Sequence, residues 1–175
     1  TTLADDTSFP HYSARESLKL WMNTFLYLNS SDSNKEITEW AKKMLSGTTV
    51  SMVRNGVDPN SNPVSREKAE SVTQELLGAL CPGKKTVEVG EAKKTKASSA
   101  DESVTVYDKA GWINGSSDDA VCDAGIIEEE GKYYLITIMT NLADGETSRA
   151  EVSNLAAALW DQRSTLAPEQ GYKPV

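Results

Sequence analysis

The segment Lys132–Thr140, with the sequence KYYLITIMT, limits the possible folds of this chain more than any other stretch. β-Branched and aromatic residues dominate it, and apolar side chains stand at both its odd and its even positions. Such a run predicts a β-strand that is covered on both faces. A short acidic turn, Glu128 to Gly131, precedes it, and glycine favours the positive φ of a tight turn. We therefore expect an antiparallel hairpin between Ala124–Glu128 and Lys132–Thr140.

Three helices are predicted by their start signals. In each, a serine is followed three residues later by a glutamate, which is the pattern of a capping box. The boxes are Ser13–Glu16, Ser33–Glu36 and Ser148–Glu151, and apolar residues recur at helical spacing after each one. Gly47 is expected to end the second helix.

Residues 57–103 differ from the rest in composition and predict an insertion. The turn-rich GVDPNSNPVS, residues 56–65, leads into this stretch, which continues with a predicted helix at Arg66–Leu80 and ends with the polar EAKKTKASSADES. A strand at Val104–Ile113 follows it. The order of elements predicts an α+β fold with an antiparallel sheet packed with helices, in which residues 1–175 form a single domain or the C-terminal part of one.

Three antiparallel strands leave an apolar strand at the edge of the sheet, an arrangement that natural proteins avoid. The strand Lys132–Thr140 needs a further neighbour on its other side. Either the segment KKTVEVGE, residues 84–91, supplies that strand or a second polypeptide does.

Charge and composition exclude several classes of function. The 175 residues carry a formal net charge of −8, which disfavours nucleic acids and anionic membranes as partners. No apolar run approaches the roughly 20 residues of a membrane span. His11 is the only histidine, and we expect neither a metal site nor a cofactor. Cys81 and Cys122 have no metal-binding spacing but can form one disulfide in an oxidising compartment, which would tie the insertion to the strand region. The first residue is not methionine, so we expect a mature or trimmed chain.

Two short motifs are candidates for acyl-transfer chemistry. Ser65 and Lys68 match S-x-x-K, but Ser65 opens an amphipathic helix, and its role as an N-cap explains it. The second motif is Lys109-Ala110-Gly111. A lysine there can hold a carboxylate, glycine allows a close approach to the backbone, and the amide of Trp112 can donate to an oxyanion. A strand with a solvated lysine explains the same residues.

The surroundings of this motif resemble the C-terminal portion of class A β-lactamases and their serine-hydrolase relatives, which include DD-peptidases. The segments VYDKAGWI, DAGIIEEEGKYYLITIMTN and SRAEVSNLAAALWDQR resemble, in order, the K-[TS]-G strand, the following hairpin and the C-terminal helix of that family. TSFPHYSARESLKLWMNTFLYLN is similar to the helix after the omega loop, and the second helix with MVRNG is similar to the segment before the K-[TS]-G strand. The resemblance covers residues 1–55 and 104–163.

The resemblance implies a part of a secreted or cell-envelope enzyme that binds β-lactams or peptidoglycan peptides. Lys109 would hold the substrate carboxylate, and the Trp112 amide would help form the oxyanion hole. The family's hydroxyl residue is replaced by Ala110. The family's S-D-N motif is absent, since Ser31-Asp32-Ser33-Asn34 resembles it without matching it. The glutamate of the family's E-x-x-L-N motif has no counterpart either.

In this interpretation the nucleophile helix lies in a missing N-terminal half or second chain, which also completes the sheet. The chain alone is then expected to be inactive. Two alternatives stay open: a non-catalytic cell-envelope binding or interaction module that keeps the fold, and an unrelated α+β domain that contains K-A-G by chance.

Overall fold

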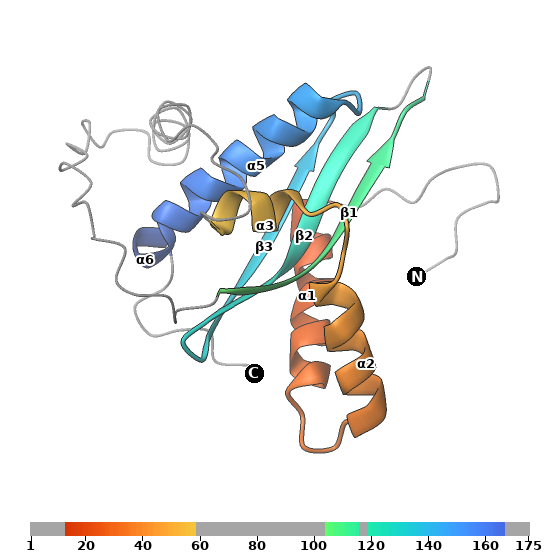
Figure 1. Cartoon of the computed structure of the whole chain (residues 1–175), viewed down its shortest axis with the longest axis vertical. Helices are drawn as coiled ribbons and strands as arrows, with labels where there is room; N and C mark the ends of the chain where they lie inside the picture. Colours follow the sequence, from red (N-terminus) through yellow and green to blue (C-terminus); the bar gives the residue numbers. More distant parts are fainter. Residues whose placement is uncertain (1–12, 59–103, 116–118, 167–175) are drawn as a thin grey trace.

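A computed structural model of the chain describes residues 13–58, 104–115 and 119–166. These residues form an α+β fold with a three-stranded antiparallel sheet packed between helices, as predicted (Figure 1). No helix in this described part is long and apolar enough to cross a membrane. The elements are α1 (Ala14–Leu28), α2 (Lys35–Ser46), α3 (Met52–Val57), β1 (Thr105–Ile113), β2 (Ala120–Glu129), β3 (Lys132–Thr140), α5 (Glu146–Asp161) and α6 (Arg163–Leu166).

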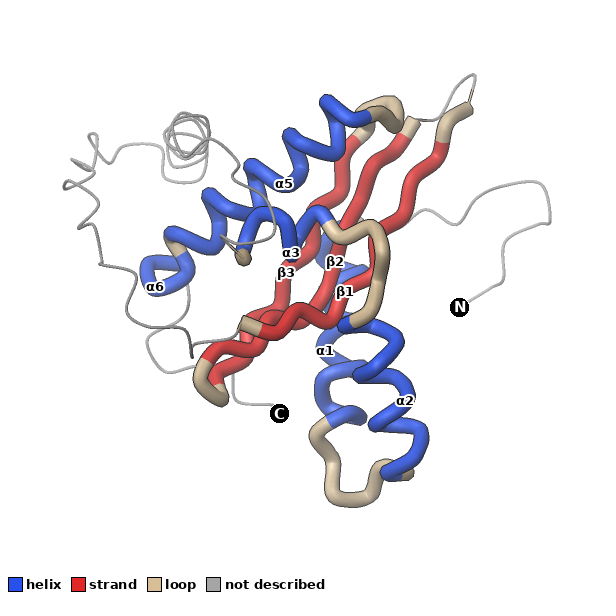
Figure 2. Tube along the Cα trace, viewed as in Figure 1, coloured by secondary structure: helices blue, strands red, loops and turns tan. Residues whose placement is uncertain are grey.

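The sheet has the order β1-β2-β3 and separates two helical layers (Figure 2). Helices α3 and α5 pack together on one face, while α1 and α2 lie on the other. Side chains of helices contact β3 on both faces, but Ile138 is its only buried residue and Met139 is 40% exposed, so the predicted covering of both faces is incomplete. Within the described residues it is nevertheless an edge strand, because only β2 pairs with it.

The main core lies between the sheet and the layer formed by α3 and α5. Aliphatic side chains that point to this face of the strands meet the inner sides of the two helices in two adjoining clusters, which include Val106, Ala110, Val121, Ile127 and Ile138 from the strands and Met52, Val53, Val152, Ala156 and Trp160 from the helices. Helix α3 comes unusually close to α5. A Cβ atom on Gly56 would lie 2.3 Å from the Ser153 carbonyl oxygen.

The layer of α1 and α2 is much less buried. Leu28 is the only buried residue of α1, and α2 has none among the described residues. Trp40 of α2 is 64% exposed although it belongs to the predicted apolar face of that helix. Most of the large exposed apolar side chains lie here: Leu18, Leu20, Leu26, Tyr27, Ile37, Trp40 and Met44.

Two of the predicted helix starts are wrong, and one is confirmed. The box of Ser13 and Glu16 forms as expected. The N-cap of α2 is Asn34, not Ser33, because the Asn34 side chain accepts the hydrogen bond from the backbone of the first turn. Helix α5 starts at Glu146, so Ser148 lies inside it, and its hydroxyl donates to a carbonyl oxygen at 2.6 Å instead of capping the helix.

The remaining predictions divide into three groups. Gly47 ends α2 and β3 has the predicted bounds, whereas β2 begins at Ala120, four residues earlier than expected. Helix α3 was not predicted, because its first residues follow no apolar repeat. The predicted helix Arg66–Leu80 and most of the insertion lie outside the described residues, so these stay predictions.

The turn between β2 and β3 determines which backbone groups face outward. Glu130 and Gly131 have φ values of 51° and 74°, which is the two-residue turn typical of tight hairpins. The closing pair, Glu129 and Lys132, is therefore hydrogen-bonded, and bonded and non-bonded pairs alternate from there. The β3 residues that direct their N–H and C=O groups away from β2 are Tyr133, Leu135, Thr137 and Met139.

Candidate functional site

The predicted Lys109-Ala110-Gly111 motif lies on β1, the other edge strand of the described sheet. Strand alternation separates its side chains. Lys109 is exposed on the face that carries α1 and α2, whereas Ala110 is 3% exposed and packs in the core. The Trp112 ring lies on the same face as Ala110, where the Arg149 guanidinium stacks 4.4 Å from its centre.

The backbone of this motif brings two donors to one edge. The alternation set by the hairpin continues through β2, so Ala110 and Trp112 direct their N–H and C=O groups away from the sheet. Consistent with this parity, Arg54 donates to the outward carbonyl of Val106 at 3.3 Å. The Lys109 side chain bends toward its own strand, and its ammonium group donates to the carbonyl oxygen of Ala110. The cation and the Trp112 N–H are thus placed along the same strand edge.

Gly111 leaves the face of the strand beside Lys109 uncrowded among the described residues. A Cβ atom at this position would meet no described atom within 4 Å. A ligand can therefore approach the backbone beside Lys109 and Trp112. An ammonium group and an amide N–H in this arrangement suit an anion, such as a carboxylate or a developing oxyanion.

Two buried aspartates lie directly behind this edge. Asp108 is 0% exposed and Asp123 is 1% exposed. Asp108 pairs with Gly125 and Asp123 with Ala110 in the register of β1 and β2, so the two carboxyl groups are diagonal neighbours on one face of the sheet.

Asp108 is held by side chains that precede or begin α3. Thr48 donates to its Oδ1 at 2.7 Å, and the Ser51 hydroxyl donates to its Oδ2. Arg54 forms an ion pair with Oδ1 at 3.4 Å. Three donors from one short segment therefore converge on a single carboxylate of β1.

Asp123 binds the beginning of α3 through the backbone. Its Oδ2 accepts hydrogen bonds from the amides of Met52 and Val53 at 2.7 and 2.9 Å. Its Oδ1 is buried and has no hydrogen-bond partner among the described residues. Burial, and then the nearby Asp108 carboxylate, raise the pKa of Asp123 to about 7.

This acid pair holds β1 from inside the core. Both carboxyl groups are enclosed, and Ser51, which donates to one of them, is itself buried at 5% exposure. Their contacts fix residues 48–54 against the strand that carries Lys109. The sequence contains a signal for them, because VYDKA and VCDAG each place an aspartate among apolar strand residues. A buried polar residue is more informative than an exposed apolar one.

The other predicted site residues are placed only in part. Cys122 lies opposite Gly111 in β2, is half-buried and forms no disulfide with any described residue. Cys81, Ser65, Lys68 and His11 lie outside the described residues, so the disulfide stays a prediction. The described ranges contain no group of three side chains able to hold a metal ion.

Comparisons of the chain with protein-family models, with curated proteins and with solved structures gave no match. The assignment of a function therefore rests on the residues of β1 and their surroundings.

Proposed function

We propose that this chain is the C-terminal part of a β-lactamase-like serine hydrolase that acts on β-lactams or cell-wall peptides outside the cytoplasm. Lys109 holds the carboxylate of the substrate, and the Trp112 amide contributes to the oxyanion hole. The nucleophile belongs to another half of the enzyme. The observation that supports the proposal is that the Lys109 ammonium and the Trp112 N–H lie along one edge of β1, with which no described strand pairs.

Binding of a carboxylate tests the role of Lys109. We expect benzylpenicillin, added to the ¹⁵N-labelled chain, to shift the amide resonances of Gly111 and Trp112. Lys109→Met should weaken this binding about tenfold or more, because a hydrogen bond to a charged group contributes roughly 1.5–3 kcal/mol. Lys132→Met removes another exposed lysine, at the hairpin turn, and should leave the affinity unchanged. Equal affinities for the two variants would contradict the proposal.

Covalent labelling tests whether the nucleophile lies outside this chain. Groups that only position a substrate cannot form an acyl intermediate. Mass spectrometry after incubation with benzylpenicillin should therefore detect no adduct on the isolated chain. An adduct would mean that the chain carries its own nucleophile.

The second candidate is a non-catalytic cell-envelope binding or interaction module. Ala110 favours it, because this residue offers no hydroxyl to a substrate carboxylate and its side chain packs in the core. Joining the chain to its upstream coding segment separates the two functions. Penicillin labelling of a serine in an S-x-x-K helix supports the enzyme, and carboxylate binding without labelling supports the module.

A further inference from the structure

The last residues of β1 receive little support from the core. Gly111 has no side chain to pack, and the Trp112 side chain is 44% exposed. Within the described sheet, only β2 pairs with this strand. The end of an edge strand opens more readily than the centre of a sheet. A hydrogen-bond donor at this place, such as the Trp112 N–H, therefore needs further contacts to keep a fixed position.

Arg149, near the start of α5, supplies one such contact. Its guanidinium stacks on the Trp112 ring, 4.4 Å from the ring centre. The same guanidinium forms two hydrogen bonds with Asp144, from Nε to Oδ1 at 2.6 Å and from Nη2 to Oδ2 at 2.7 Å. Because two parallel hydrogen bonds fix the plane of an arginine fork, they also fix the surface that Arg149 presents to the Trp112 ring.

Asp144 connects this arrangement to β1 a second time. Its backbone N–H donates to Oδ1 of Asn114 at 2.8 Å, and Asn114 directly follows the last residue of the strand. The end of β1 and the start of α5 lie at the same end of the sheet (Figure 1). Two separate contacts thus join residues 112 and 114 to the segment around the start of α5. These four residues, Trp112, Asn114, Asp144 and Arg149, are named the β1 clamp.

The two charges of the β1 clamp balance each other. The Arg149 and Asp144 side chains are 33% and 12% exposed, and they form a close ion pair. The Arg149 guanidinium also lies on the face of β1 that carries α5, whereas Lys109 is exposed on the opposite face. Arg149 is therefore suited to hold the strand and not to bind the anion that Lys109 would bind.

The β1 clamp and the acid pair hold the strand on either side of the predicted motif. Asp108, directly before Lys109, is bound by residues that precede or begin α3. The clamp holds the residues that follow Gly111. Donors that stabilise a developing negative charge are effective when they are fixed before the ligand arrives. The segment between the two anchors carries the Lys109 ammonium and ends at the Trp112 N–H.

We propose that Arg149 and Asp144 are positioning residues for the Trp112 amide. By holding the Trp112 ring and Asn114, they keep the Trp112 N–H directed out of the sheet edge, where it donates to a carboxylate or oxyanion oxygen of the ligand. Neither residue contacts the ligand itself. The identity of the ligand rests on the proposed function, whereas the fixed position of the strand end does not depend on it.

Hydrogen exchange tests whether the β1 clamp holds the strand. Gly111 and Ile113 form hydrogen-bonded pairs with β2, so their amides exchange when this end of β1 opens. Arg149→Ala should speed the exchange of both amides roughly fivefold, since it removes a half-exposed stack and an ion pair. The amide of Tyr107, toward the other end of the strand, should keep its rate, which separates local opening from a general loss of stability.

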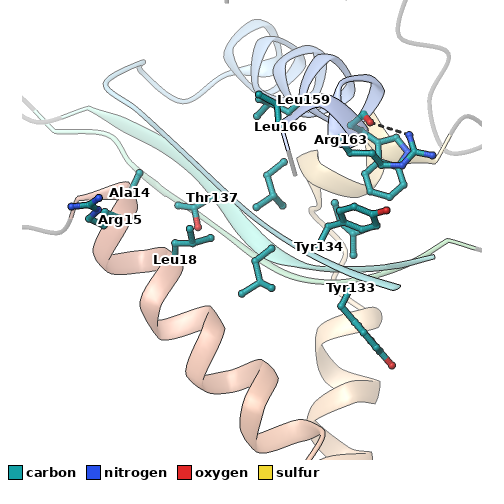
Figure 3. A pocket seen from close by; sticks show the side chains of 13 residues that line it. Ala14, Arg15, Leu18, Tyr133, Tyr134, Thr137, Leu159, Arg163 and Leu166 are labelled. Atoms are coloured by element: carbon teal, nitrogen blue, oxygen red, sulfur yellow. Dashed lines mark hydrogen bonds between the residues drawn. The ribbon is translucent and has the colours of Figure 1, made fainter. Parts of the chain in front are cut away.

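Arg163→Ala is the matched control. Arg163, at the pocket drawn in Figure 3, forms the same kind of contact at the other end of α5: its guanidinium lies 4.1 Å from the centre of the Trp160 ring and pairs with Glu129 at 3.0 Å. Its removal should leave the two β1 amides unchanged. Equal acceleration in both variants, or none in Arg149→Ala, would overturn the inference.

Ligand affinity tests whether Arg149 acts through the Trp112 ring. Trp112→Ala removes the ring and keeps the backbone amide, so a double-mutant cycle isolates the contact. Arg149→Ala should weaken the binding of benzylpenicillin roughly fivefold in the wild type, but by less than about twofold in the Trp112→Ala background. An equal loss in both backgrounds would contradict the inference, because Arg149 would then act by another route.

The two proposals fail separately. If the wild type binds no benzylpenicillin, the proposed function fails, and the exchange rates alone decide whether the β1 clamp holds the strand. If the wild type binds it while Arg149→Ala changes neither exchange nor affinity, the clamp is wrong and the role of Lys109 stands. Circular dichroism checks that each variant folds. Arg149→Lys, which keeps the charge without the planar fork, replaces Arg149→Ala if that variant is unfolded.

Discussion

Among the described residues, the guanidinium of Arg54 pairs with the buried carboxylate of Asp108, and no cation pairs with the neighbouring carboxyl group of Asp123. Two unprotonated carboxylates would leave an uncompensated charge in the core, which is costly. With Asp123 protonated, the single charge of Asp108 is matched by Arg54 and by the two hydroxyl donors. The cost of a second buried charge raises the pKa of Asp123, so its carboxyl group loses its proton only near neutral pH.

Protonation of Asp123 makes the stability of the chain depend on pH. Its pKa rises from 3.8 in the unfolded chain to about 7 in the folded one, so the folded state binds the proton more tightly. The resulting stabilisation is fully present below pH 4 and is lost as the pH rises through 7. Asp123→Asn keeps an acceptor for the two α3 amides and removes the titration. We expect the free energy of unfolding of the wild type, relative to this variant, to fall by roughly 1 kcal/mol for each pH unit as the pH rises toward 7.

Urea unfolding between pH 4 and 8 measures this difference. Asp144→Asn is the matched control, because the Arg149 guanidinium lowers the pKa of Asp144 and the sign is then opposite. Stability from Asp144 is present above its ordinary pKa and is lost only as the solution becomes acidic. Parallel curves for the wild type and Asp123→Asn would show that Asp123 does not titrate in this range.

Single residues were predictable where their role is local. The strand that carries Lys109, and the exposure of that lysine, follow from alternation along β1. The contacts of Asp108 with Thr48 and Ser51 join positions about 60 residues apart, and no local pattern encodes such a pairing. The sequence therefore predicts a candidate edge but not the acid pair that fixes it.

At the level of elements, helix caps illustrate the same limit. Ser13 caps α1 as its pattern predicts, because an isolated helix start is determined by its own first turn. At α2 and α5 several polar residues stand near the start of the helix, and the N-caps are Asn34 and Gly145 instead of the predicted serines. Both segments are helices, as predicted, but each helix starts one to a few residues away from its predicted start.

Helix α3 shows how one glycine determines an element contact. Gly56→Ala would add a Cβ 2.3 Å from the Ser153 carbonyl oxygen and 2.7 Å from the Ala157 amide nitrogen, both backbone atoms that cannot rotate away. Alanine gains up to about 1 kcal/mol of helix propensity, but forced separation of packed elements costs roughly 1–3 kcal/mol or more. We expect a net loss of stability in urea unfolding.

Gly111→Ala is the control for this substitution, since its Cβ would meet no described atom within 4 Å. Its free energy of unfolding should stay within about 0.5 kcal/mol of the wild type. If Gly56→Ala were equally neutral, α3 and α5 would not be in the close contact described.

On the scale of the whole molecule, the two helical layers differ in what they contribute to stability. Both buried clusters lie between the sheet and the α3 and α5 layer. The opposite layer leaves Trp40 and Met44 more than half exposed. Sequence periodicity predicted apolar faces for α1, α2 and α5 alike, because it reports which side chains lie together and not what covers them.

Native-state hydrogen exchange should reveal this asymmetry. Amides of α2 should exchange through local opening at a free energy below that of β2, because α2 buries no residue while β2 is bonded to a strand on each side. Val152→Ala, which removes a side chain that is 1% exposed in the main core, should lower the exchange free energies of β2 and α5 together by about 2 kcal/mol. The α2 amides should keep their wild-type values, since their opening leaves that core intact. If α2 instead followed β2 in both proteins, the chain would unfold as one cooperative unit, and the layer of α1 and α2 would be as firmly held as the core.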